Sequence, residues 1–158
     1  MPASTLEVLS LAHEGISAAR QEDWEKALPL LSWVGETKVK HQEMPGIYYS
    51  FLGYGIAKVR GQKQEGLKLC EHAVQLQFYE ADNHWNLARV RLLLGDRKGA
   101  VRAANTGTRL DPQHIELAQL RKDLGLRRTQ LFPQLGRGHA LNKLFGQLRH
   151  ALFGTPKG

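Results

Sequence analysis

The sequence predicts an all-α protein built from a repeated pair of helices. Two polar turn sequences, "RGQKQEG" and "LGDRKGA", place Gly61 and Gly95 34 residues apart. Each is followed by a helical stretch with small residues on one side, and the earlier stretch "ARQEDWEKALPLL" has the same form. Internal similarity at a fixed period is typical of repeat architectures, in which neighbouring units bury a shared core. We therefore expect three stacked helix pairs.

Small residues recur where two helices of a pair would meet. Each expected turn is followed, five positions later, by a small residue of the next helix: Ala27, Gly66 or Ala100. Glycine inside a helix costs about 1 kcal/mol relative to alanine, so Gly53 and Gly107 need a packing reason. Close contact between two helix backbones supplies one. We expect Gly53 to lie against Ala73, and Ala88 against Gly107.

Prolines mark the boundaries between the units. Pro45 separates the first unit from the second, and Pro112 ends the third, because the residue before a proline is biased out of helix. The segment after Pro112 reads "QHIELAQLRKDLG", and Gly125 stands where a helix C-cap is expected. Its apolar residues are Ile115, Leu117, Ala118, Leu120 and Leu124. We expect this helix to close the array.

Residues 81–114 resemble a tetratricopeptide repeat (TPR). The residues that match the family pattern are Leu87, Ala88, Gly95, Ala100, Gly107 and Pro112. The second unit matches through Tyr49, Leu52, Gly53, Ile56, Gly61 and Ala73, and the first through Leu11, Gly15, Trp24, Ala27 and Val34. In the first unit, Glu22 stands where the turn glycine would be. The resemblance covers residues 5 to about 125. It implies a right-handed superhelical array of three TPR-like helix pairs with a C-terminal capping helix.

The resemblance also implies a concave groove lined by the first helix of each pair, in which a peptide or helix of a partner protein binds. The positions that line this groove in the family correspond here to Leu9, Ala12, Ile16, Ala19, Ile47, Ser50, Tyr54, Ala57, Asp82, Trp85, Arg89 and Leu92. Tyr54, Trp85 and Arg89 would form an aromatic and cationic patch, a combination enriched at binding hot spots. The alternative is that Trp85 only packs against its neighbours. The residues expected to contact a partner are Ile16, Ser50, Tyr54, Lys58, Asp82, Trp85, Arg89 and Leu92.

Some members of the family grip the terminal carboxylate of a peptide with Lys and Asn at fixed groove positions. This sequence has Ala12, Ser50 or Trp85 where that lysine could sit. It has Ile16, Tyr54 or Arg89 where the asparagine could sit. That mode of binding is therefore not implied.

The last quarter of the chain carries the whole positive charge. Residues 1–120 hold 14 basic and 14 acidic side chains, whereas residues 121–158 hold 8 basic and 1 acidic, which accounts for the net charge of +7. We expect a repeat domain over residues 5–125 and a basic strap with an amphipathic helix over residues 126–158. The apolar face of that helix comprises Leu141, Leu144, Phe145, Leu148 and Leu152.

Three roles remain open for the amphipathic helix. It packs on the array, docks on a partner protein, or attaches the molecule to an anionic membrane or nucleic acid. The contact residues expected in this tail are Lys143, Phe145, Leu148, Arg149 and Leu152.

No motif in the sequence indicates catalysis or a cofactor. Cys70 is the only cysteine, which rules out an intrachain disulfide, and we expect it to be a buried, inert thiol. The seven histidines lack metal-site spacing, so we expect surface or capping roles for them and no metal. No glycine-rich phosphate loop occurs, and we expect neither an enzyme nor a small-molecule substrate.

The sequence shows neither a secretory signal nor an apolar run long enough to span a membrane, and this predicts a cytoplasmic protein. The predicted function is that of a non-enzymatic adaptor that binds a partner protein in its groove. The alternative is a tethering protein that uses its basic tail. The sequence does not indicate the oligomeric state.

Overall fold

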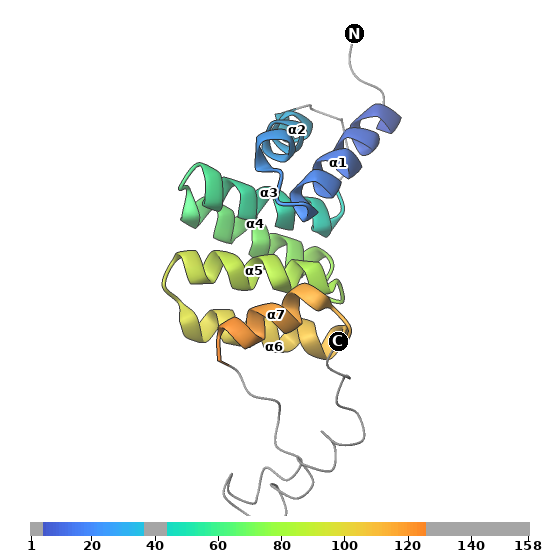
Figure 1. Cartoon of the computed structure of the whole chain (residues 1–158). Helices are drawn as coiled ribbons and strands as arrows, with labels where there is room; N and C mark the ends of the chain where they lie inside the picture. Colours follow the sequence, from blue (N-terminus) through green and yellow to red (C-terminus); the bar gives the residue numbers. More distant parts are fainter. Residues whose placement is uncertain (1–4, 37–43, 126–158) are drawn as a thin grey trace, which may run out of the picture. The chain divides into compact units, whose positions relative to one another are not determined.

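The computed structural model of the chain describes residues 5–36 and 44–125, and within these ranges it contains seven α-helices and no strand (Figure 1). The helices are α1 (Thr5–Arg20), α2 (Trp24–Glu36), α3 (Gly46–Val59), α4 (Lys63–Leu76), α5 (Ala81–Leu93), α6 (Arg97–Leu110) and α7 (Ile115–Asp123). The all-α class is therefore confirmed. The additional amphipathic helix expected in residues 126–158 lies outside the described residues.

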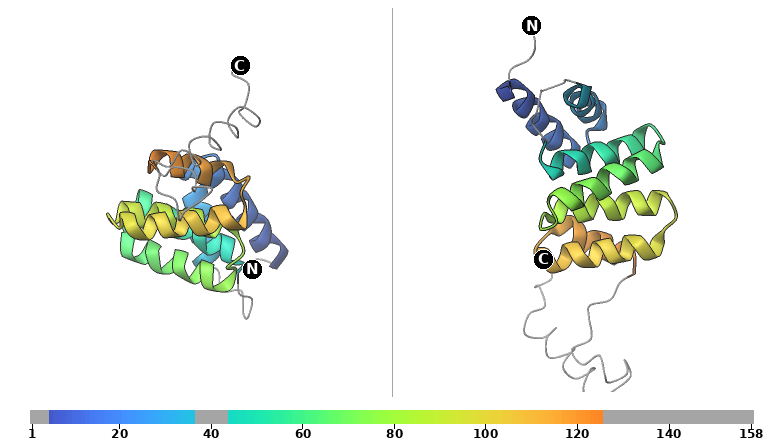
Figure 2. Two further views of the ribbon diagram at one scale, coloured as in Figure 1. Left: turned by 90° about the horizontal axis from the view of Figure 1, so that it is seen from below. Right: turned by 180° about the vertical axis from the view of Figure 1, so that it is seen from behind.

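The helices are arranged as three successive pairs followed by a closing helix. α1 packs on α2, α3 on α4, and α5 on α6, and α7 packs on α6. Between the pairs, α3 contacts α1 and α2, and α5 contacts α3 and α4. The right view in Figure 2 shows α3 beside α4 and α5 beside α6. This is the arrangement of stacked helix pairs that the repeat predicts.

The turn inside each helix pair and the C-terminal end of α7 each contain a residue in the left-handed backbone conformation. Gly61 has φ of +72°, Gly95 of +79° and Gly125 of +65°. Glycine adopts this conformation without steric cost, and the sequence places a glycine at each of these turns. Glu22 adopts it as well, with φ of +60°, and is the only residue other than glycine to do so within the described ranges.

The backbones of α3 and α4 approach most closely at two glycines. A Cβ atom on Gly66 would lie 2.4 Å from the carbonyl oxygen of Gly53, and one on Gly53 would lie 2.8 Å from that of Gly66. Gly53 also faces Leu69 and Cys70, so the expected pairing with Ala73 is wrong. Two antiparallel helices meet at residues equally distant from the turn, and Gly53 and Leu69 each stand eight positions from Gly61.

Gly107 in α6 is also a point of close approach, here to Leu117 and His84 rather than to a second glycine. A Cβ atom there would lie 2.6 Å from a methyl carbon of Leu117 and 3.1 Å from the Cβ of His84. Gly107 therefore lies against α5 and α7, and the expected pairing with Ala88 is wrong. Ala88 and Ala100 are nevertheless fully buried, as close packing of the pair requires.

The closing helix α7 buries a narrower stripe than its sequence suggests. Leu117 and Leu124 are buried, and Leu120 is half-buried. Ile115 and Ala118 are exposed. The stripe is narrow because α7 packs on α6 at the end of the array.

Candidate functional site

The first helices of the three pairs bring a set of polar and aromatic side chains together. We call this set the first-helix face: Arg20, Glu22, Tyr54, Lys58, Asp82, Trp85 and Arg89. Arg20 ends α1, and Glu22 lies in the turn that follows. Tyr54 and Lys58 come from α3, and the other three residues come from α5.

Arg89 lies between two aromatic rings of the first-helix face. The carbon of its guanidinium is 3.5 Å from the ring centroid of Tyr54 and 4.2 Å from that of Trp85. One guanidinium nitrogen donates to Oδ1 of Asn86 over 3.3 Å. The predicted aromatic and cationic patch therefore forms. Its rings are buried, however, and only 12% of the Arg89 side chain is exposed.

The carboxylate of Glu22 binds two cations of the first-helix face, Lys58 and Arg89. It accepts hydrogen bonds from Nζ of Lys58, from the guanidinium of Arg89, and from Nε1 of Trp24, the last over 2.9 Å. Burial by itself would raise the pKa of Glu22, but these donors outweigh it and lower the pKa to about 2. Glu22 is therefore ionised at neutral pH.

Trp24 holds the turn that carries Glu22 against the second pair. A Cβ atom on Gly55 would lie 2.8 Å from the Trp24 ring, so the indole rests directly on the backbone of α3. Its ring also meets that of Tyr54 edge to face, with centroids 5.3 Å apart. The absence of a side chain at Gly55 thus lets the first pair approach closely enough for Glu22 to reach Lys58.

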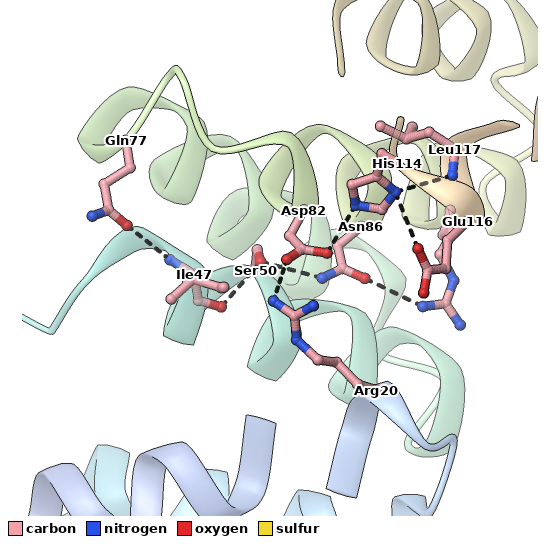
Figure 3. A network of polar contacts seen from close by, with 10 residues as sticks. Arg20, Ile47, Ser50, Gln77, Asp82, Asn86, His114, Glu116 and Leu117 are labelled. Carbon is pink, nitrogen blue, oxygen red and sulfur yellow. Dashed lines mark hydrogen bonds and ion pairs between the residues drawn. The ribbon is translucent and has the colours of Figure 1, made fainter. Parts of the chain in front are cut away.

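A second ionic group joins α1, α5 and the start of α7 (Figure 3). The guanidinium of Arg20 donates to Oδ2 of Asp82, whose side chain is only 6% exposed. Nε2 of His114 lies 3.1 Å from Oδ1 of the same carboxylate. On the other side of the ring, Nδ1 accepts from the backbone N–H of Leu117 over 3.2 Å and so caps α7. The hydrogen bond to Asp82 raises the pKa of His114, although burial opposes the shift.

A separate set of buried polar contacts joins α5 to α3 in the middle of the array. Nδ2 of Asn86 donates to Oγ of Ser50 over 3.2 Å, and this hydroxyl donates to the carbonyl oxygen of Ile47 over 3.0 Å (Figure 3). Ser50 is fully buried. It therefore serves the packing of α3 on α5, and a partner could not reach it without displacing these helices.

Five of the eight predicted groove residues meet on the first-helix face: Tyr54, Lys58, Asp82, Trp85 and Arg89. Ser50 lies beneath them, Ile16 is buried in the core, and Leu92 is a half-buried residue packed against that core. Their contact with a partner stays a prediction.

Sequence reasoning missed Arg20 and His114, and it treated Glu22 only as a mismatch to the turn glycine. The glutamate in place of the turn glycine was the sequence feature that could have indicated a role for Glu22. Nothing in the sequence pattern distinguishes Arg20 from other exposed basic residues.

The remaining titratable groups have structural surroundings. Cys70 is fully buried, its thiol lies 3.5 Å from the carbonyl oxygen of Ser50, and burial raises its pKa, as expected of an inert thiol. His84 is buried, with Nε2 2.7 Å from the carbonyl oxygen of Phe78, so the expectation of a surface or capping role is wrong for it.

The described residues show neither a metal-ligand cluster nor a helix that could span a membrane. In residues 5–36 and 44–125, no three His, Cys, Asp or Glu side chains are grouped as metal ligands would be. The helices of the same ranges include none with the length and apolar character needed to cross a bilayer. The predicted tail contacts Lys143, Phe145, Leu148, Arg149 and Leu152 lie outside the described residues.

The fold is similar to that of a protein solved with a bound partner segment. No protein-family model matches the sequence, and no curated protein matches it either. Among solved structures, the chain is similar to PcrH in its crystal structure with the chaperone-binding region of PopB. The TM-score is 0.58 at 18% identity, over 77% of this chain and 97% of the PcrH chain. This likeness shows a TPR-like array of helix pairs.

Proposed function

We propose that this chain is a non-enzymatic, chaperone-like adaptor that binds an extended or helical segment of a partner protein on its first-helix face. The fold supports a binding role, because stacked helix pairs present a continuous surface made by successive units. PcrH, which shares the fold, was solved with a segment of PopB. Only the class of ligand, a peptide segment of another protein, is carried over from PcrH to this chain.

The observation that carries the proposal is that the first-helix face has buried aromatic rings beneath accessible charged side chains. Its aromatic rings are buried, whereas three charged side chains above them remain accessible: Arg20 is 49% exposed, Glu22 44% and Lys58 38%. Protein interfaces combine aromatic residues and arginine with a polar, solvent-accessible rim. A partner would therefore reach charged side chains first on this face.

Selection from a random 12-residue peptide library on the full-length protein tests this function. We expect peptides that bind with micromolar affinity and that shift the NMR signals of Lys58, Tyr54 and Arg89. Arg20→Ala together with Lys58→Ala should weaken their binding about tenfold, which corresponds to about 1.4 kcal/mol.

Matched control substitutions use two exposed lysines of α4. Lys63→Ala together with Lys68→Ala removes the same charge away from the first-helix face and should leave peptide affinity unchanged. Failure to select any peptide, or binding weakened equally by both pairs of substitutions, would contradict the proposed site.

A further inference from the structure

Glu22 combines a disfavoured backbone conformation with a side chain that accepts three hydrogen bonds. The equivalent turns of the second and third pairs carry glycine in the left-handed conformation, at Gly61 and Gly95. Residues with a side chain rarely adopt this conformation, so a glycine would suit the turn of the first pair better. The side chain of Glu22 therefore needs a reason that lies in its contacts.

Those contacts amount to an anion bound by two cations and an indole N–H. Lys58 comes from the second pair and Arg89 from the third, whereas the carboxylate comes from the first. Arg89 is also held independently of Glu22, by the rings of Tyr54 and Trp85 and by Asn86. The arginine is thus preorganised and would remain in place if the carboxylate moved away.

The two side chains of the Glu22–Arg89 ion pair differ in their exposure to solvent. The Arg89 side chain is 12% exposed, whereas that of Glu22 is 44% exposed and lies on a turn. If Glu22 rotated into water, Arg89 would be left nearly buried without a charged partner, which is unfavourable unless another anion replaces it. A neutral group offers no such replacement, so the geometry discriminates in favour of a carboxylate.

We propose that Lys58 and Arg89 form the binding site for an acidic side chain of the partner segment, and that Glu22 occupies this site as an internal substitute while no partner is bound. The inference rests on the proposed function and names the chemistry of the partner: a peptide with an Asp or Glu at one fixed position. Its binding exchanges one carboxylate for another on the same two cations.

The test compares peptide selection on the wild type and on variants of the site. A random 12-residue library is selected on the full-length wild type, on Glu22→Gln, on Glu22→Gly, and on Lys58→Gln with Arg89→Gln. Glu14→Gln is the matched control, because Glu14 forms an exposed ion pair with Lys26 in the first unit. Thermal unfolding followed by circular dichroism verifies that each variant is folded.

We expect an acidic residue at one position of the peptides selected by the wild type and by both Glu22 variants. Both Glu22 variants should bind these peptides about tenfold more tightly than the wild type, because the competing carboxylate is gone. The Glu14→Gln variant should match the wild type. The Lys58→Gln and Arg89→Gln double variant should lose the acidic preference.

Synthetic peptides then identify the source of the carboxylate. Replacing the selected acidic residue by its amide should weaken binding at least tenfold, whereas amidation of the peptide C-terminus should have no effect. The opposite result would assign the site to a terminal carboxylate and overturn the proposal.

A direct measurement on the wild type does not depend on any variant. The pKa of the Glu22 carboxyl, followed by NMR, should rise from about 2 toward 4.5 when an acidic peptide saturates the protein. An unchanged pKa would show that the exchange does not occur. Peptides that bind the first-helix face without acidic preference would overturn this inference and leave the proposed function intact. Failure to select any peptide would overturn both.

Discussion

Arg20 in the first helix pair donates to Asp82 in the third, across 62 positions of sequence and past the whole second pair. The contact between Glu22 and Arg89 spans 67 positions in the same way. In helical repeat arrays each unit ordinarily contacts only its neighbours. These two ion pairs add a direct connection between the outer units on the first-helix face.

The Arg20–Asp82 pair should contribute more to stability than an ordinary surface ion pair. Asp82 is nearly buried, so removal of Arg20 leaves a carboxylate that water reaches poorly. A double-mutant cycle with Arg20→Gln and Asp82→Asn, measured by urea unfolding, should give a coupling free energy of about 1–2 kcal/mol. The half-exposed Glu14–Lys26 pair is the control and should give at most about 0.5 kcal/mol. Equal coupling in both cycles would show that the connection between outer units is energetically unimportant.

Because α3 and α4 approach so closely, we expect a single added methyl group between them to change the free energy of unfolding substantially. In Gly66→Ala, the added Cβ would meet the backbone carbonyl of Gly53, which cannot rotate away. Overpacking of this kind typically costs about 1–3 kcal/mol, which exceeds the gain of about 1 kcal/mol in helix propensity. The free energy of unfolding should therefore fall. Gln64→Ala, an exposed substitution in the same helix, should leave it nearly unchanged.

The sequence was sufficient to predict the helix pairs because their determinants are local. Gly61, Gly95 and Gly125 mark helix ends through a backbone conformation that glycine favours, and Pro45 and Pro112 mark boundaries between units. Which small residues face each other depends on how the two helices are aligned, and the spacing within one helix does not give that alignment. The facing residues can be predicted by counting outward from the turn, as Gly53 and Leu69 show.

The candidate site was only partly predictable because it depends on contacts between units. Tyr54, Trp85 and Arg89 lie at family groove positions, and they do meet. Glu22 reaches them only because the first pair packs closely on α3, a distance that no local pattern encodes. The same packing places Trp24 against the Tyr54 ring, whereas the Trp85 ring is covered by Phe51, His114 and Arg89.

Cys70 should be unreactive in the folded protein. Its thiol is fully buried, and burial raises its pKa, so the reactive thiolate is scarce at neutral pH. We expect alkylation by iodoacetamide at pH 8, followed by mass spectrometry, to proceed only through unfolding. The rate should then rise with urea in proportion to the unfolded population. Rapid labelling without denaturant would show that α3 and α4 separate locally.

Two histidines, the buried His84 and the half-buried His114, should give the stability of the protein a maximum near pH 6.5. The hydrogen bond to Asp82 raises the pKa of His114 above its ordinary value of 6.5, against the effect of burial. Burial lowers the pKa of His84, against the effect of its hydrogen bond to Phe78. A raised pKa contributes stability that is complete below 6.5 and is lost as the pH rises through the folded-state value. A lowered pKa contributes stability that is complete above 6.5 and is lost as the pH falls.

The two contributions separate experimentally because they act on opposite sides of pH 6.5. His114→Asn keeps an acceptor for the N-cap of α7 but cannot titrate, so it should remove the fall in unfolding free energy above pH 6.5. His84→Asn should remove the fall below that pH and leave the other limb intact. Urea unfolding at half-unit intervals between pH 5 and pH 8 measures both limbs. His13→Asn, an exposed control in α1, should alter neither limb. A profile of His114→Asn that still declines above pH 6.5 would contradict the assignment of that decline to His114.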